Sequence, residues 1–115
     1  EQVRPEQILR KFLHSRMEML SRPSHSFDIA ISEFAANSEK GRAALKKRAE
    51  DSIHILTQLI ENGNKAGVFT CSVPEITAAH ILWLMEGMSR HAVLIPITEK
   101  QIEEQISQIE QLLQK

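Results

Sequence analysis

Apolar side chains recur every three or four residues along almost the whole chain, a spacing that predicts α-helices. Runs of β-branched residues are few, which argues against a sheet. The pattern divides the chain into five predicted helices, over residues 5–20, 26–36, 38–62, 74–92 and 98–113. We therefore expect an all-α fold, a five-helix bundle, with residues 1–115 forming one domain.

Capping and breaking residues mark the ends of these helices. Pro23 ends the first, because the residue before a proline is pushed away from helical geometry. Ser38 can cap the third helix and Thr98 the fifth, where Gln101 follows at capping-box spacing. Pro74 suits the first turn of the fourth helix, since its missing N–H costs nothing there.

The fourth helix differs from the others because apolar residues cover every face of it, among them Trp83, Met85 and Met88. A helix that is apolar all round must be buried all round. In so short a chain, a second copy is the simplest cover for the remaining face, because two-fold homodimers are the commonest soluble oligomers. The alternative is a central helix surrounded by its own neighbours.

Composition narrows the function classes. The chain has 115 residues, and its 14 basic against 15 acidic side chains leave a net charge of −1, so it carries no electrostatic footprint for nucleic acid. The single cysteine, Cys71, excludes an internal disulfide and fits a reducing cytoplasm. No apolar run reaches membrane-spanning length, so we expect no membrane partner.

Residues 59–88 contain an ordered series of short motifs. They are Leu59-Ile60, Gly63, Gly67-Val68-Phe69, Pro74, Ala78-Ala79 and Gly87. This order, with two final helices after the turn, resembles the C-terminal half of the tetracycline-repressor (TetR) family of bacterial transcriptional regulators. The helix-turn-helix that reads DNA in that family has no counterpart here, and we expect it upstream of Glu1. Val73 also departs from the family, which often has an aspartate there.

The resemblance implies two functional surfaces. The last two helices would form a four-helix interface with their two-fold mates, through Ile81, Leu82, Met85, Met88, Ile102, Ile106, Ile109 and Leu113. The first four helices would enclose a small apolar or amphipathic effector, with Phe12, Arg16, Met17, Phe27, Phe34, Ile53, Leu56 and Trp83 as its predicted contacts. Alternatively, the large apolar residues fill a solid core, and the arginine only reaches solvent.

Other chemistry finds little support in the residue spacing. No two of the five histidines lie three or four residues apart and no Cys-x-x-Cys occurs, so we expect no metal site and no cofactor. No nucleophile–base pair or phosphate-binding loop is recognisable in the sequence, so we expect that the chain is not an enzyme. The basic side chains of residues 42–48 have acidic neighbours, which predicts a solvated helix face rather than a DNA contact.

The sequence thus favours a ligand-responsive regulatory domain that forms a homodimer, binds a small-molecule effector, and controls DNA binding by an N-terminal domain outside this chain. The second hypothesis is a helical dimerisation or adaptor module that binds a protein partner and has no small-molecule pocket.

Overall fold

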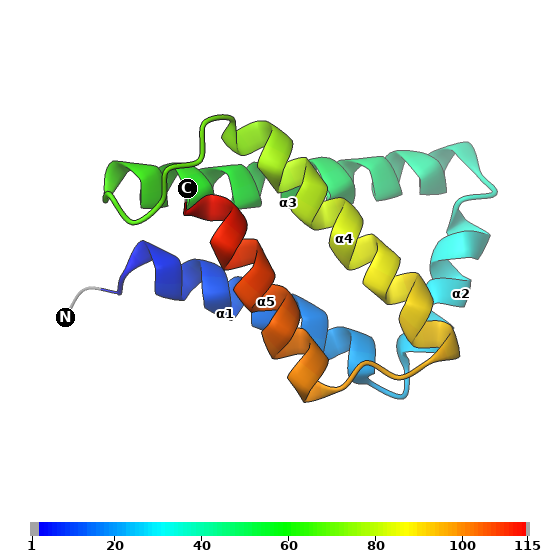
Figure 1. Ribbon diagram of the computed structural model, residues 1–115. Helices are drawn as coiled ribbons and strands as arrows, with labels where there is room; N and C mark the ends of the chain where they lie inside the picture. The colour runs from blue at the N-terminus through cyan, green and yellow to red at the C-terminus, as the bar shows by residue number, and fades with distance from the viewer. Residues whose placement is uncertain (1–2, 115) are drawn as a thin grey trace.

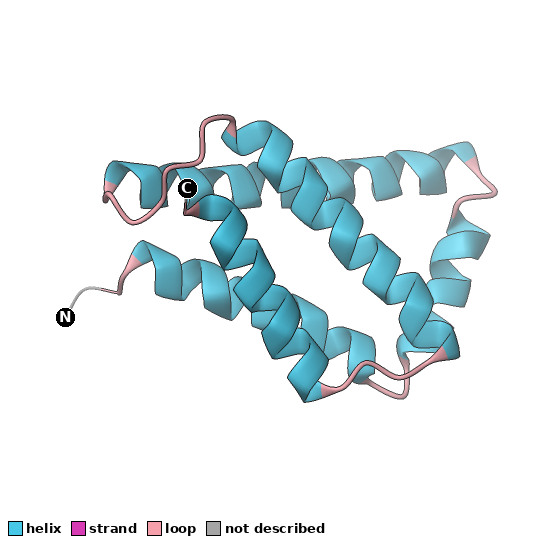
Figure 2. Ribbon diagram, in the orientation of Figure 1, coloured by secondary structure: helices cyan, strands magenta, loops and turns pink. Residues whose placement is uncertain are grey.

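The computed structural model describes residues 3–114, and every regular element within them is helical. The elements, shown in Figures 1 and 2, are α1 (Pro5–Glu18), the short 3₁₀ helix η1 (Met19–Ser21), α2 (His25–Ala35), α3 (Glu39–Lys65), α4 (Pro74–Leu94) and α5 (Glu99–Leu113). The all-α prediction is confirmed. α3 and α4 continue past their predicted ends, to Lys65 and Leu94.

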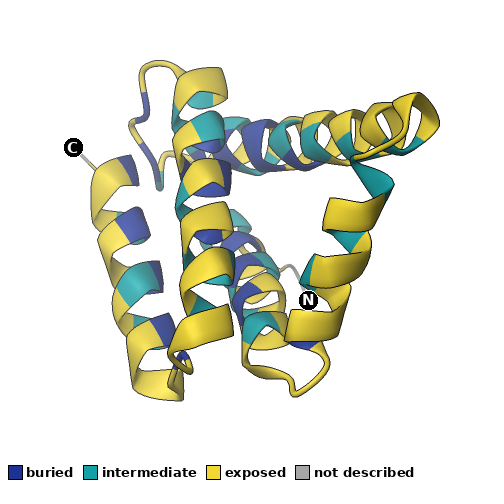
Figure 3. Cartoon of the chain, turned by 90° about the vertical axis from the view of Figure 1, so that its right-hand side faces the viewer, coloured by how far each residue is buried: buried dark blue, intermediate teal, exposed yellow. Residues whose placement is uncertain are grey.

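The helices form two crossed layers. α4 and α5 lie side by side in one layer and cross α3 and α1 behind them, as the views in Figures 1 and 3 agree. α2 connects the end of α1 to the start of α3 and stands at the edge of the bundle. Consequently α2 has fewer neighbours to cover it than the other helices.

Side-chain caps begin α3 and α5 as the sequence predicts. The Ser38 hydroxyl accepts a hydrogen bond from the Gly41 N–H at 3.0 Å. Thr98 and Gln101 form the complete capping box, in which each side chain accepts from the other residue's backbone N–H. These bonds satisfy helix N–H groups that have no partner within the helix.

The turn between α3 and α4 is held from both sides. The Asn64 side-chain amide donates to the Cys71 carbonyl oxygen at 2.8 Å and accepts from the Cys71 N–H at 3.0 Å. Gly67 has a φ of +81°, a left-handed conformation that glycine adopts without strain. The buried Phe69 ring then packs directly against Gly63 of α3. The turn therefore covers the end of the core that lies between the C-terminus of α3 and the N-terminus of α4.

One core joins α1, α3, α4 and α5, and Figure 3 shows their buried residues facing one another. Its fully buried large side chains are Leu9, Leu13, Met17, Leu56, Ile60, Ile81, Ile102, Ile106, Ile109 and Leu113. The aliphatic residues of α5 belong to it because α5 packs along α1.

This core contains most of the residues that the sequence predicts for the dimer interface. Ile102, Ile106, Ile109 and Leu113 are at most 1% exposed within a single chain. The chain's own core likewise covers Ile81, Leu82 and Met85, and it half-buries Met88. The chain's own core therefore already accounts for the burial of these residues, except for the exposed part of Met88.

The outer face of α4 is left uncovered by the chain itself. Trp83 is 60% exposed, and Ile76 and Leu94 are exposed as well. The alternative of a central helix surrounded by its own neighbours is therefore wrong. Separately, within residues 3–114 no helix is both long enough and apolar enough to cross a membrane.

Candidate functional site

Part of the predicted effector pocket lies in and beside the core near α1 and α3. Met17 and Leu56 are fully buried, while Phe12 and Ile53 are half-buried and pack against the core. The Arg16 guanidinium lies 5.0 Å from the centroid of the Phe12 ring, a cation–π contact at the surface. Met17 and Leu56 therefore fill the core, and only the other side chains of this group can be reached from outside.

The remaining predicted pocket residues lie on exposed faces. Phe27 and Phe34 stand on the outer face of α2, where Phe34 is 79% exposed. Trp83 lies on the outer face of α4, with its ring 5.5 Å from that of His80. The structure does not gather these three aromatic side chains with Phe12 into one cavity. Their hydrophobicity predicted burial, but the single chain offers nothing to bury them.

Polar contacts attach α2 to the second half of α4. His25 is buried at the start of α2, and its Nε2 lies 2.9 Å from the Ser89 carbonyl oxygen and 3.1 Å from the Ser89 hydroxyl. An exposed ion pair joins Arg90 to Glu33 at 2.6 Å. The position of α2 is thus coupled to α4 through these side chains.

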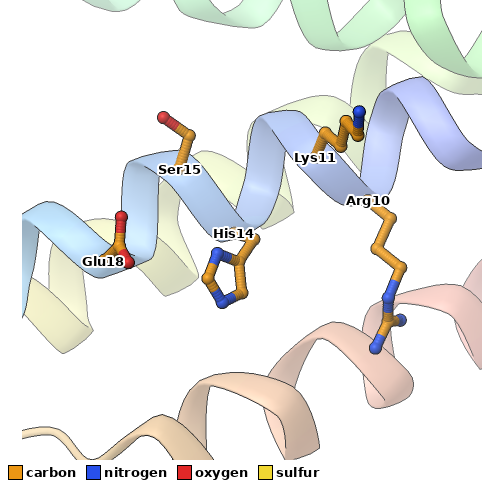
Figure 4. Close-up of a pocket in the computed structure, with 5 residues that line it drawn as sticks. All are labelled: Arg10, Lys11, His14, Ser15 and Glu18. Atoms are coloured by element: carbon orange, nitrogen blue, oxygen red, sulfur yellow. The ribbon is translucent and has the colours of Figure 1, made fainter.

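A second group of polar contacts joins α1 to α5. Arg10 donates to Glu110 at 2.9 Å and also to Glu103. His14 Nε2 lies 2.7 Å from a Glu99 carboxylate oxygen and 3.6 Å from one of Glu103. In Figure 4 the side chains of Arg10 and His14 extend toward α5. This junction therefore combines two cationic or titratable groups of α1 with three carboxylates of α5.

An open pocket along α1 is lined by Arg10, Lys11, His14, Ser15 and Glu18, of which Lys11 and Ser15 point away from α5 (Figure 4). The hydrogen bond to Glu99 stabilises the imidazolium form and raises the pKa of His14 above its usual value. The bond to Glu110 similarly raises the pKa of Arg10. The acidic partners thus favour positive charge at both α1 side chains.

Sequence spacing did not predict this junction. His14 and its acidic partners on α5 are 85 and more residues apart in the chain, so a search for local His pairs misses them. The only local sign is the spacing of Glu99 and Glu103, which places two carboxylates on one side of a helix. The sequence does not indicate which helix packs against the side of α5 that carries these two carboxylates, because that depends on the tertiary fold.

Comparison with known proteins gives one match. A family model described as the tetracyclin repressor-like C-terminal domain covers residues 2–90. No curated protein and no solved structure matches the chain. The matched segment covers most of the sequence and includes the turn and the start of α4 that carry the motif order. The chain belongs to the tetracycline repressor-like C-terminal domain family.

Proposed function

We propose that the chain is a ligand-responsive regulatory domain that dimerises through the outer face of α4 and binds a small apolar or amphipathic effector beside α1, α2 and α3. Domains of this family are regulatory and not enzymatic. The observation that carries the proposal is the uncovered apolar face of α4. The DNA-binding domain that it would control is not in this sequence.

The proposed dimer face follows one side of α4. Ile76, His80, Trp83 and Gly87 are exposed and recur at intervals of three and four residues, so they share a stripe along the helix. α5, in the same layer, exposes Leu112. Complete burial of a large apolar side chain contributes about 1.5–3 kcal/mol, and a partner would add the part that corresponds to the surface still exposed here. A second copy would supply that cover without any rearrangement of the core.

Gly87 supports a close helix contact at this face. A glycine inside a helix costs about 0.5–1 kcal/mol relative to alanine. Apart from its own turn of helix, a Cβ at Gly87 would meet no atom of residues 3–114 within 4 Å, so nothing in the described part of the chain requires a glycine there. A neighbouring helix that approaches the α4 backbone closely would explain why position 87 is a glycine, because any larger side chain would hold that helix away.

Light scattering coupled to size exclusion tests this surface. We expect the wild-type chain to run as a dimer and Trp83→Glu to run as a monomer, because the substitution places a charge in the proposed contact. Phe34→Glu, on the equally exposed face of α2, is the matched control and should leave the mass unchanged. A wild-type chain that remains monomeric at every concentration would overturn the dimer.

The proposed effector site uses the side chains near α1 that remain accessible. Arg16 and Phe12 offer a cation beside an aromatic ring, and Ile53 adds apolar surface. The exposed aromatic side chains of α2, Phe27 and Phe34, lie outside this surface and would join it only if α2 moved. A carboxylate-bearing amphipathic compound matches both the guanidinium and the apolar surface. Closure of α2 over such a ligand would give two conformations of different ligand affinity, as ligand control requires.

Thermal-shift measurements with a panel of amphipathic carboxylic acids test the site. Binding should raise the melting temperature, because a ligand that binds only the folded state stabilises it. Arg16→Ala should reduce the shift, whereas Arg48→Ala, an exposed arginine of α3, should not. A shift that survives Arg16→Ala unchanged would place the ligand elsewhere.

The adaptor hypothesis rests on a different observation, the exposed apolar face of α2 formed by Phe27, Ile31 and Phe34. An exposed apolar stripe of this kind fits the groove of a protein partner. Absence of any thermal shift across the panel, together with a stable dimer, would favour this function over effector binding.

A further inference from the structure

The α1–α5 junction contains a group of metal-ligating side chains that the proposed function does not use. His14 of α1 and Glu99 and Glu103 of α5 each offer one ligand atom, and these atoms all lie within 4.8 Å of one another. Among residues 3–114 no other group of histidine, cysteine, aspartate and glutamate has this arrangement. Two helices contribute to it, so the fold itself creates the cluster.

The spacing of the ligand atoms suits a small divalent cation. In a tetrahedral zinc site with bonds of about 2.0–2.2 Å, neighbouring ligand atoms lie roughly 3.4 Å apart. His14 Nε2 lies 2.7 Å from its Glu99 ligand oxygen and 3.6 Å from that of Glu103, on either side of that value. Shifts of about 1 Å in these partly exposed side chains would bring the atoms around an ion.

The surrounding charges are compatible with a cation. Arg10 binds one carboxylate oxygen of Glu103, while the other oxygen of Glu103 is the one nearest His14. This bond orients the carboxylate toward the imidazole, the role that outer-shell partners serve in metal sites. Glu18 adds a further negative charge near His14. With Glu99, three carboxylates oppose the single guanidinium of Arg10.

We propose that His14, Glu99 and Glu103 form a binding site for a first-row divalent cation of the Zn²⁺ type, with the remaining coordination position open to water. One imidazole nitrogen and two carboxylate oxygens favour such an ion over Mg²⁺ or Ca²⁺, which take oxygen ligands. The bound ion would replace the hydrogen bond between His14 and Glu99. It would thereby connect α1 to the start of α5 through coordinate bonds.

Zn²⁺ titration by calorimetry tests the site in the chelator-treated chain. We expect one ion per chain and a rise in melting temperature, because the ion binds ligands that only the folded chain assembles. His14→Gln should weaken binding at least about tenfold, and Glu99→Gln should do the same. His80→Gln is the matched control, since this exposed histidine lies outside the cluster, and its affinity should equal the wild type's.

Co²⁺ provides a second measurement. Its visible absorption spectrum reports coordination by nitrogen and oxygen and should disappear in His14→Gln. Circular dichroism first establishes that each variant folds, and Glu103→Gln serves if one of the others does not. Zn²⁺ affinity that is undetectable, or equal in His14→Gln and His80→Gln, would overturn the site and leave the group as an ion pair only. None of these outcomes depends on dimerisation or on an effector.

Discussion

His25 of α2 donates a hydrogen bond from Nε2 to the carbonyl oxygen of Ser89 on α4, across 2.9 Å. The carbonyl can only accept, so Nε2 carries the proton. His25 is the only buried residue of α2. The face of α2 that carries Phe27 and Phe34 is exposed. This side chain is therefore the buried polar attachment of α2 to α4, beside the exposed ion pair of Glu33 and Arg90.

His25→Ala should consequently loosen α2. The substitution removes the hydrogen bond and leaves the Ser89 hydroxyl without its ring partner, which costs about 1–3 kcal/mol of unfolding free energy. Amide hydrogen exchange should accelerate in α2 more than in α3 or α5. His54→Ala, at an exposed position of α3, is the control and should change neither quantity. Uniform acceleration over all helices would show that His25 supports the fold generally rather than α2 in particular.

Local interactions of the fold could be predicted from the sequence because neighbouring residues determine them. The capping box of Thr98 and Gln101 requires only two side chains three positions apart, and it is present as predicted. By contrast, the apolar seam of α5 shows which side of the helix is buried but not what buries it. The sequence pattern predicts that Ile106 contacts a partner chain, whereas in the structure Ile106 is buried inside the protomer.

The candidate sites were harder to predict for the same physical reason. Large aromatic residues such as Phe34 and Trp83 indicate that some surface must be covered, and either a core, a ligand or a partner can cover it. The cluster of His14, Glu99 and Glu103 depends on α5 folding back along α1. Residue spacing within one helix does not indicate which residues from a distant helix will pack against it.

The reassigned seam of α5 makes a stability prediction. Ile106→Ala should lower the free energy of unfolding by about 2–5 kcal/mol, because it removes a fully buried side chain and leaves a cavity. Leu112→Ala, at a 60% exposed position of the same helix, should change it by less than about 0.5 kcal/mol in the monomer. Denaturant unfolding in the Trp83→Glu background separates folding from association. Equal effects of the two substitutions would contradict the placement of the seam in the core.

Two helical glycines should respond oppositely to alanine. A Cβ at Gly63 would lie 2.0 Å from the Phe69 ring, so Gly63→Ala must displace a buried aromatic side chain and should lower the melting temperature. The new methyl group of Gly87→Ala meets no other element within residues 3–114, so the substitution should stabilise the monomer by about 0.5–1 kcal/mol through helix propensity. Its effect on association should be unfavourable if a partner helix contacts the α4 backbone. Thermal unfolding and dimer dissociation constants of both variants check this pair, and tighter dimers for Gly87→Ala would argue against a close backbone contact.

Tryptophan fluorescence reports directly on the solvent exposure of the outer face of α4, because Trp83 lies on that face and is the single tryptophan of the chain. In the isolated protomer its side chain is 60% exposed, so its emission should lie at the long wavelength typical of a solvated indole. On concentration the emission maximum should shift to shorter wavelength, in parallel with the mass measured by light scattering. Gly87→Glu, which places a charge at the centre of the stripe, should keep the solvated spectrum at every concentration. A dimer by mass whose emission stays at long wavelength would show that the chains associate through another face, and the exposed apolar side of α2 would then be the next surface to test by Phe27→Glu.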